Sequence, residues 1–118
     1  MSRAVVVTGS GGISAAVIRS LREDRVFILG GSEEEISALS PQCPQISGHY
    51  LADLRKEEEV AKGFIHAESN LGKITDVIGI VGGSGRKFGD GPLTEVSKEG
   101  WDATLELNLT TAALTAKY

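Results

Sequence analysis

The sequence predicts an α/β fold in which an open, mostly parallel sheet is covered by helices on both faces. Three observations predict it. Short apolar runs rich in β-branched residues recur along the chain, segments with helical spacing separate them, and the two kinds alternate. Alternation of this kind is typical of parallel strands joined by right-handed crossovers. No repeat or low-complexity linker interrupts the pattern, so we expect one domain over residues 1–118.

Four apolar runs are the expected strands. Ala4–Thr8 and Val26–Leu29 contain almost only apolar residues, which is typical of strands buried on both faces of a sheet. His49–Leu51 is a short candidate for the third strand, and Asp76–Val81 is the fourth. A glycine-rich loop is expected over Gly82–Pro92.

Helical spacing of apolar residues marks the segments between the strands. Ser32 followed by Glu35 has the spacing of a capping box, in which the two side chains satisfy free backbone N–H groups at a helix start. We expect Trp101 to pack against the domain rather than to bind a ligand. The predicted helices are Ile13–Arg22, a short helix to about Leu39, Lys56–Leu71, and a last one from Ser97 to the end.

Composition excludes several classes of protein. The net charge of -4 argues against nucleic acid or a membrane surface as a partner, because both require a basic face. Cys43 is the single cysteine, and His49 and His66 have no cysteine beside them, so we expect no disulfide and no metal site. No apolar stretch approaches the roughly 20 residues of a membrane helix. We therefore expect a cytoplasmic domain.

The turn after the first strand has the composition of a dinucleotide-binding turn. One glycine would make the tight turn, another would let the backbone approach a pyrophosphate, and a third small residue would let helix and strand pack closely. A tight turn without a ligand is the alternative. Two spacings fit the turn, Gly9-x-Gly11-x-x-Ser14 and Thr8-Gly9-x-x-Gly12-x-x-Ala15. The candidate binding residues here are Gly9, Ser10, Gly11, Gly12 and Ile13.

Landmarks in the same order along nearly the whole chain resemble the short-chain dehydrogenase/reductase family. The resemblance rests on their joint order rather than on one motif. The landmarks are Val6-Val7-Thr8-Gly9 with the glycine turn, Asp53-Leu54, Asp76-Val77-Ile78 leading to Gly82-Gly83, Gly91-Pro92-Leu93, Trp101 and Asn108-Leu109-Thr110.

The resemblance implies a Rossmann-like, three-layer fold with strand order 3-2-1-4, and a bound NAD or NADP. It implies that the Asp53 carboxylate and the backbone N–H of Leu54 hold the adenine ring, and that Gly82 and Gly83 admit a ribose. Asn108 would be the catalytic asparagine that holds a water molecule in a proton relay. The residues alone also allow Asp53 to cap the helix that follows it.

The chain departs from the family pattern in four places. Ile80 and Val81 replace two asparagines at the end of the fourth strand, and the glycine turn is one residue shorter. The second strand ends without a carboxylate or an arginine for the adenosine ribose; Ser32 could bind a 2′-phosphate, whereas Glu33–Glu35 would repel one. NAD and NADP both remain open. The catalytic serine and Tyr-x-x-x-Lys pair of the family are missing.

The last helix shows no stop signal, which suggests a fold that is truncated after its fifth helix begins. Either a fragment of a longer enzyme or a naturally short relative would explain it. In both cases the fourth strand would be an edge, and unpaired edges associate with other chains. We therefore expect a homodimer or larger assembly through the fourth strand or the fifth helix.

Three functions are compatible with these observations. The first is the NAD(P)-binding part of an oxidoreductase, inactive by itself because the catalytic tyrosine and lysine are missing. The second is a non-catalytic relative that serves as a nucleotide-binding or interaction module. The third is a flavodoxin-like mononucleotide-binding domain, for which a different strand order is expected.

Overall fold

A computed structural model describes residues 2–83 and 91–118 of the chain. Its centre is a four-stranded parallel sheet with the order β3-β2-β1-β4. The predicted strand order is therefore confirmed, and it differs from the order of a flavodoxin-like domain. The strands are β1 (Ala4–Thr8), β2 (Arg25–Leu29), β3 (Ile46–Tyr50) and β4 (Asp76–Ile78).

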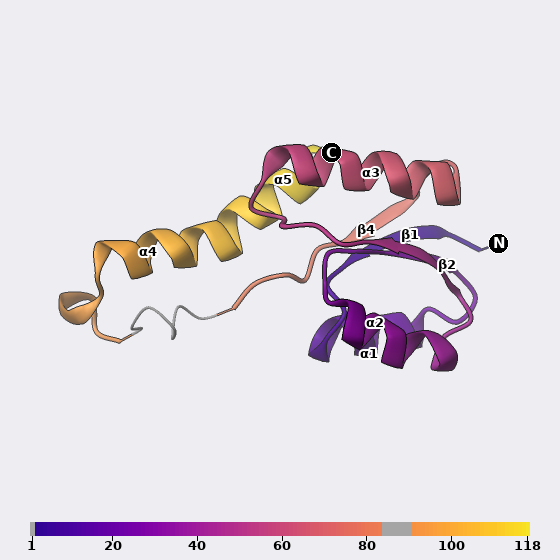
Figure 1. Cartoon of the computed structure of the whole chain (residues 1–118), viewed down its shortest axis with the longest axis horizontal. Coiled ribbons are helices and arrows are strands. Elements are labelled where there is room, and N and C mark those ends of the chain that lie inside the picture. The colour runs from indigo at the N-terminus through magenta and orange to yellow at the C-terminus, as the bar shows by residue number, and fades with distance from the viewer. Residues whose placement is uncertain (1, 84–90) are drawn as a thin grey trace.

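Helices cover both faces of the sheet. In Figure 1, α1 and α2 lie on one face and α3 and α5 on the other, which makes the three layers of a Rossmann-like fold. None of the helices in the described part of the chain combines the length and the apolar character that crossing a membrane requires. The helices are α1 (Gly12–Ser20), α2 (Glu33–Leu39), α3 (Glu57–Leu71), α4 (Lys98–Leu105) and α5 (Thr111–Lys117), with short turns η1 (Ser40–Gln42) and η3 (Leu93–Glu95).

The alternation of side chains along the strands divides the core into two clusters. Val5 and Val7 of β1 point to the face of α1 and α2, where they pack with Ile18. Ala4 and Val6 point to the opposite face. All five residues of β1 are buried, so the prediction of a strand buried on both faces is confirmed. This rigid central strand ends at Thr8, where the glycine turn begins.

The fourth strand is shorter than predicted. Pairing with β1 ends at Ile78 rather than at Val81. Beyond that point the hydroxyl Oγ1 of Thr8 accepts hydrogen bonds from the backbone N–H groups of Ile80, at 2.8 Å, and Val81, at 3.2 Å. The buried hydroxyl of Thr8 thus takes the place of a backbone partner for these two N–H groups. The run of apolar residues in the sequence continues to Val81 and does not indicate where the strand ends.

The third strand was placed too late in the sequence. It spans Ile46–Tyr50 rather than His49–Leu51, because its hydrogen bonds to β2 begin where Val26 N–H donates to the carbonyl of Gln45. Because Gly48 and the residues beside it are not apolar, this strand lacks the pattern of apolar residues from which strands are predicted. The α2 helix agrees with its predicted cap, since Ser32 Oγ accepts a hydrogen bond from Glu35 N–H.

The chain after residue 90 forms a helical arm. α4 continues through a π-helical segment, η4 (Glu106–Thr110), into α5, and α4 extends away from the sheet (Figure 1). The buried residues of this arm are small: Gly100, Thr111 and Thr115. The expectation that Trp101 packs against the domain is wrong, because its side chain is 49% exposed. The helix itself was predicted correctly, but its apolar residues Trp101, Leu105 and Leu109 lie on the outer face.

Candidate functional site

The predicted site residues gather at the carboxyl edge of the sheet. The glycine turn follows β1, Gly30 to Ser32 follow β2, Asp53 follows β3, and Gly82 and Gly83 follow β4. The strand order reverses between β1 and β4, so this edge contains the topological switch point where open α/β sheets bind ligands. Residues distant in the sequence thus come together because all four strands point the same way. Of the predicted Gly82–Pro92 loop, residues 84–90 lie outside the described residues.

The glycine turn brings helix α1 very close to strand β1. Gly9 has φ +85°, and a Cβ atom there would lie 2.8 Å from Ser14 Oγ. Ser14 is buried and donates a hydrogen bond to the carbonyl of Thr8 at 2.8 Å. Gly12 has φ +45° and open space where a side chain would be. Ser14 is therefore the small residue of the close helix–strand contact, as in the first of the two predicted spacings.

Gly11 has a different role from its two neighbours. It is the N-cap of α1 with an ordinary φ of -104°, and no side chain caps the helix. A Cβ atom on Gly11 would overlap the carboxylate of Glu35. Glu35 Oε1 in turn accepts hydrogen bonds from Ser10 Oγ, at 3.0 Å, and Ser32 Oγ, at 3.1 Å. The first turn of α2 therefore places a carboxylate directly on the glycine turn.

A hollow of about 250 Å³ lies between the ends of β2, β3 and β4. Its walls contain two predicted residues, Asp53 and Leu54, of which Leu54 is buried. The Asp53 carboxylate does not cap α3: the N-cap of that helix is Lys56, without a side-chain hydrogen bond. The other residues that line the hollow are Gly30, Gly31, Ala52, Arg55, Val81, Leu107 and Thr111.

Arg55 holds the Asp53 carboxylate in a two-pronged ion pair. Arg55 Nε donates to Oδ1 at 2.9 Å and Nη2 donates to Oδ2 at 2.8 Å. The hydrogen bonds and positive charge of Arg55 lower the pKa of Asp53 from its ordinary 3.8 to about 2, although burial opposes the shift. Asp53 is therefore an ionised hydrogen-bond acceptor throughout the neutral range, fixed in position at the wall of the hollow.

Asn108 joins the helical arm to the end of the fourth strand. Its Nδ2 donates to the carbonyl of Gly83 at 2.7 Å, and its Oδ1 accepts from Gly83 N–H at 3.0 Å. A Cβ atom on Gly82 would lie 2.6 Å from that Oδ1. Asn108 lies within η4, and π-helical segments are frequent at functional sites. The structure thus brings together Asn108, Gly82 and Gly83, three residues that the sequence predicted separately.

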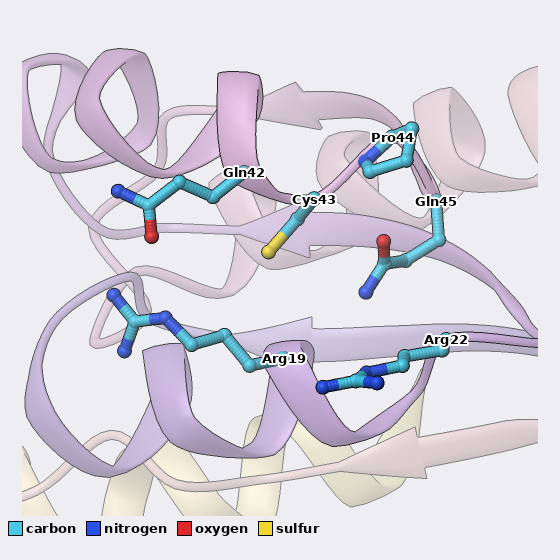
Figure 2. Close-up of a pocket in the computed structure, with 6 residues that line it drawn as sticks. All are labelled: Arg19, Arg22, Gln42, Cys43, Pro44 and Gln45. Atoms are coloured by element: carbon cyan, nitrogen blue, oxygen red, sulfur yellow. The ribbon is translucent and has the colours of Figure 1, made fainter.

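Another hollow, of about 330 Å³, lies beside α1. Figure 2 shows it between the end of α1 and the turn that follows α2, with Arg19 and Arg22 facing Gln42 and Gln45. Cys43 is buried at its base. No residue that the sequence predicts for nucleotide binding lines this hollow. Although it is the larger of the two, the carboxyl edge is the better candidate, because the glycine turn and the strand ends meet there.

Sequence reasoning missed three residues of the site. Thr8 was treated as the end of a strand, whereas its hydroxyl holds the chain after β4. Arg55 was not singled out, although its position two residues after Asp53 could have suggested a local ion pair. Glu35 was noted as a charge and as a helix-capping residue, but its contact with Ser10 depends on the turn between β2 and α2.

These features define a class: an α/β domain with a dinucleotide-binding turn at the switch point of a parallel sheet. A model of the short chain dehydrogenase family matches residues 3–118. The chain belongs to this family. No curated protein matches the chain.

Solved structures of short-chain dehydrogenases and reductases share the fold. A variant of actinorhodin polyketide ketoreductase with NADPH is 20% identical, with a TM-score of 0.83 over 99% of this chain and 47% of its own. An enzyme from Mycobacterium ulcerans is 22% identical, with a TM-score of 0.84 over 99% and 46%. One from Vibrio parahaemolyticus is 24% identical, with a TM-score of 0.80 over 96% and 52%. The chain spans about half the length of these structures.

Proposed function

We propose that this chain is the NAD(P)-binding part of an oxidoreductase of the short-chain dehydrogenase/reductase family. The observation that carries the proposal is the meeting of the glycine turn, Asp53 and Gly82–Gly83 at one edge of the sheet. We propose that all 118 residues form one such domain, and that it works in the cytoplasm. Membership in the family supports a dinucleotide as the ligand.

The glycine turn fits a pyrophosphate. Gly11 has no side chain in the way, and the N-terminal N–H groups of α1 point toward the turn, where they and the helix dipole favour an anion. The close contact between Gly9 and the small side chain of Ser14 keeps this end of the helix near β1. Ser10, Gly12 and Ile13 complete the turn, and the Ile13 side chain is 71% exposed at its mouth.

The hollow beside Asp53 fits an adenine ring. The hollow has a volume of about 250 Å³, and the apolar side chains of Leu54 and Val81 line it together with the ionised Asp53. An ionised carboxylate accepts hydrogen bonds from an exocyclic amino group. Arg55 donates two hydrogen bonds to Oδ1, from Nε and from its backbone N–H, and one to Oδ2, so further acceptor capacity remains on Oδ2. The Leu54 N–H is the second proposed contact to the ring.

Gly82, Gly83 and Asn108 lie where the other half of the cofactor would bind. The glycines leave room for a ribose, and Asn108 fixes their backbone. A bound nicotinamide cofactor supplies the hydride in such an enzyme. Asn108 is the proposed catalytic asparagine, yet its amide groups bind the Gly83 backbone and the Thr104 carbonyl here. We propose that it orders the reaction site rather than transferring a proton itself.

The 118 residues contain no Tyr-x-x-x-Lys segment. We propose that the chain therefore binds cofactor without oxidising or reducing a substrate. Turnover of any alcohol or carbonyl compound by the purified chain with NAD(P) would contradict this part of the proposal. The alternative function is a non-catalytic nucleotide-binding or interaction module, which the replacement of two strand-end asparagines by Ile80 and Val81 favours.

We also propose that the chain assembles as a homodimer or larger oligomer. β4 pairs only with β1 among the described strands, and Val77 on it is 44% exposed. On the arm, the outer side chains of Trp101, Leu105 and Leu109 are 49%, 40% and 64% exposed. Exposed apolar faces and strand edges favour association. Sedimentation of a monodisperse monomer at micromolar concentration would contradict it.

A direct test of nucleotide binding is a titration of the purified chain with NADH and with NADPH, followed by nicotinamide fluorescence. We expect saturable binding of at least one cofactor and its loss in Gly11→Val. The Cβ atom of valine would overlap the Glu35 carboxylate, although φ is ordinary there, so the carboxylate or the turn would have to shift. Gly91→Val is the matched control, since a Cβ atom there is 3.8 Å from its nearest neighbour. A folded chain that binds neither cofactor would favour the interaction module.

A further inference from the structure

We propose that the arginine-lined hollow of Figure 2 binds a small molecule with two carboxylate groups, one held by Arg19 and the other by Arg22. The hollow lies between the end of α1 and the turn that follows α2. Its volume of about 330 Å³ is at the lower end of the range of small-molecule sites. The inference does not depend on nucleotide binding, because none of the residues proposed for the cofactor lines this hollow.

The floor of the hollow is well packed. The Cys43 side chain is 2% exposed and belongs to the same core cluster as Ile18 and Leu21. Gln45 Nε2 donates a hydrogen bond to the carbonyl of Ile18 at 2.8 Å, which ties the chain before β3 to the last turn of α1. The two walls of the hollow are therefore held together by the core below them and by this hydrogen bond.

The two arginines occupy different ends of the hollow. Arg19 lies in the last turn of α1, and Arg22 lies two residues beyond its end. Figure 2 shows the Arg19 side chain facing Gln42 and the Arg22 side chain facing Gln45, with Cys43 between the two pairs. The guanidinium groups therefore lie apart rather than side by side. A single carboxylate or phosphate would contact one of them, whereas two carboxylates on one molecule would contact both.

Both guanidinium groups can take a carboxylate. Within the part of the chain that the structure describes, neither Arg19 nor Arg22 forms an ion pair with an acidic side chain. A guanidinium group presents two parallel N–H groups that match the two oxygens of a carboxylate. The side-chain amide of Gln42 brings further N–H donors to the end of the hollow where Arg19 lies.

The negative groups near the hollow limit where an anion would bind. The last carbonyls of α1 carry partial negative charge, but that of Ile18 already accepts hydrogen bonds from Gln45 and from a backbone N–H. Arg19 and Gln42 also line a neighbouring hollow of about 290 Å³, in which Glu35 lies beside the glycine turn. The Glu35 carboxylate would repel an anion there, so the two arginines are the favourable place for a dicarboxylate.

The test is a chemical-shift titration of the isotopically labelled full chain at constant ionic strength. The probes are succinate, glutarate and adipate, each compared with the acid that lacks one carboxylate: propionate, butyrate and valerate. We expect saturable shifts of the side-chain amides of Gln42 and Gln45. At least one dicarboxylate should bind about tenfold more tightly than its counterpart, because only the dicarboxylate reaches both arginines.

Variants assign the binding to the two arginines. Arg19→Gln and Arg22→Gln should each lower the affinity for the best dicarboxylate to about that of its monocarboxylate counterpart. Lys62→Gln is the matched control, because it removes the same charge from an exposed position on α3, on the other face of the sheet. It should leave the affinity unchanged. Circular dichroism of each variant separates loss of binding from loss of fold.

The other outcomes would overturn the inference. Arginines that only complement the dipole of α1 would give no saturable shifts, or equal affinity for each dicarboxylate and its counterpart. This comparison needs only the unmodified chain, so it holds even where a variant does not fold. Tighter binding that neither arginine variant weakens, or that Lys62→Gln weakens equally, would place the dicarboxylate elsewhere on the chain.

Discussion

The two sides of the carboxyl edge use their polar groups in different ways. On the side of β2 and β3, Glu35 and Asp53 are charged groups that are fixed by hydroxyls or by Arg55 and border hollows. On the side of β4, the hydroxyl of Thr8 and the amide of Asn108 bind the backbone of their own chain. On the first side the charged groups border hollows, whereas on the second side the polar groups hold the backbone of their own chain.

From this difference we propose that recognition and chemistry are divided between the two sides of the edge. We propose that the β2–β3 side recognises the adenosine, because charge and hollow occur together there. On the β4 side, the described contacts include the two hydrogen bonds by which Asn108 holds the backbone of Gly83. Binding without turnover is what such a division would produce, and variants on the two sides should therefore behave differently.

The largest effect is expected at Gly31. Alanine there combines the strain of φ +81° with a clash against Ser10, so Gly31→Ala should lower the free energy of unfolding by about 3 kcal/mol or more. Gly12→Ala is the matched control, because φ is +45° but the space is open, and about 1–2 kcal/mol is expected. Urea denaturation followed by circular dichroism measures both. Equal losses would show that the packing of Ser10 on Gly31 is not as described.

The next effect tests the β4 side. Thr8→Val preserves shape but removes the acceptor of Ile80 N–H and Val81 N–H, so the free energy of unfolding should fall by about 1–3 kcal/mol. Hydrogen exchange at these two amides should accelerate more than at the amides of β2. Unchanged exchange at Ile80 and Val81 would contradict the role assigned to the Thr8 hydroxyl.

A smaller effect is expected at Asn108. Asn108→Ala frees the Gly83 backbone at an exposed position, which should cost about 1 kcal/mol of stability. Affinity for AMP, which reaches only the β2–β3 side, should stay within about threefold of the unmodified chain. Isothermal titration calorimetry with AMP provides the measurement. A large loss of AMP affinity would mean that the two sides are coupled.

The smallest effect concerns the pKa of Asp53. Because its folded pKa is lowered to about 2 from 3.8, the carboxylate contributes stability that is present above pH 3.8 and lost as the pH falls toward 2. Arg55→Gln should raise the pKa of Asp53 toward 3.8 and so reduce this pH-dependent contribution to stability. A carboxyl-detected NMR titration follows the group directly, and an unchanged pKa would show that Arg55 does not hold it.

The sequence predicted the fold well because its signals are local. Apolar runs marked β1 and β2, and Ser32 with Glu35 marked the start of α2. β3 was misplaced because Gly48 and its polar neighbours form no apolar pattern. β4 was predicted too long because its apolar run continues after the point where the Thr8 hydroxyl, and not the backbone of β1, accepts the hydrogen bonds.

The site was predicted in part for the same reason. The glycine turn, Asp53 and Asn108 were found as motifs along the chain. The contact of Glu35 with Gly11 was not, because it depends on the φ of Gly31 and on the way Ser10 lies against the next strand end. Trp101 was misjudged, since a helical stripe does not say which face meets the domain.

The most direct test of the central claim is a map of amide chemical shifts on adding NADH to the isotopically labelled chain. Nucleotide binding at the carboxyl edge predicts saturable shifts at Gly9–Ile13, at Asp53 and Leu54, and at Gly82 and Gly83. Gln45, beside the arginine-lined hollow of Figure 2, should not move. Shifts centred on that hollow, or none at all in a folded chain, would contradict the account.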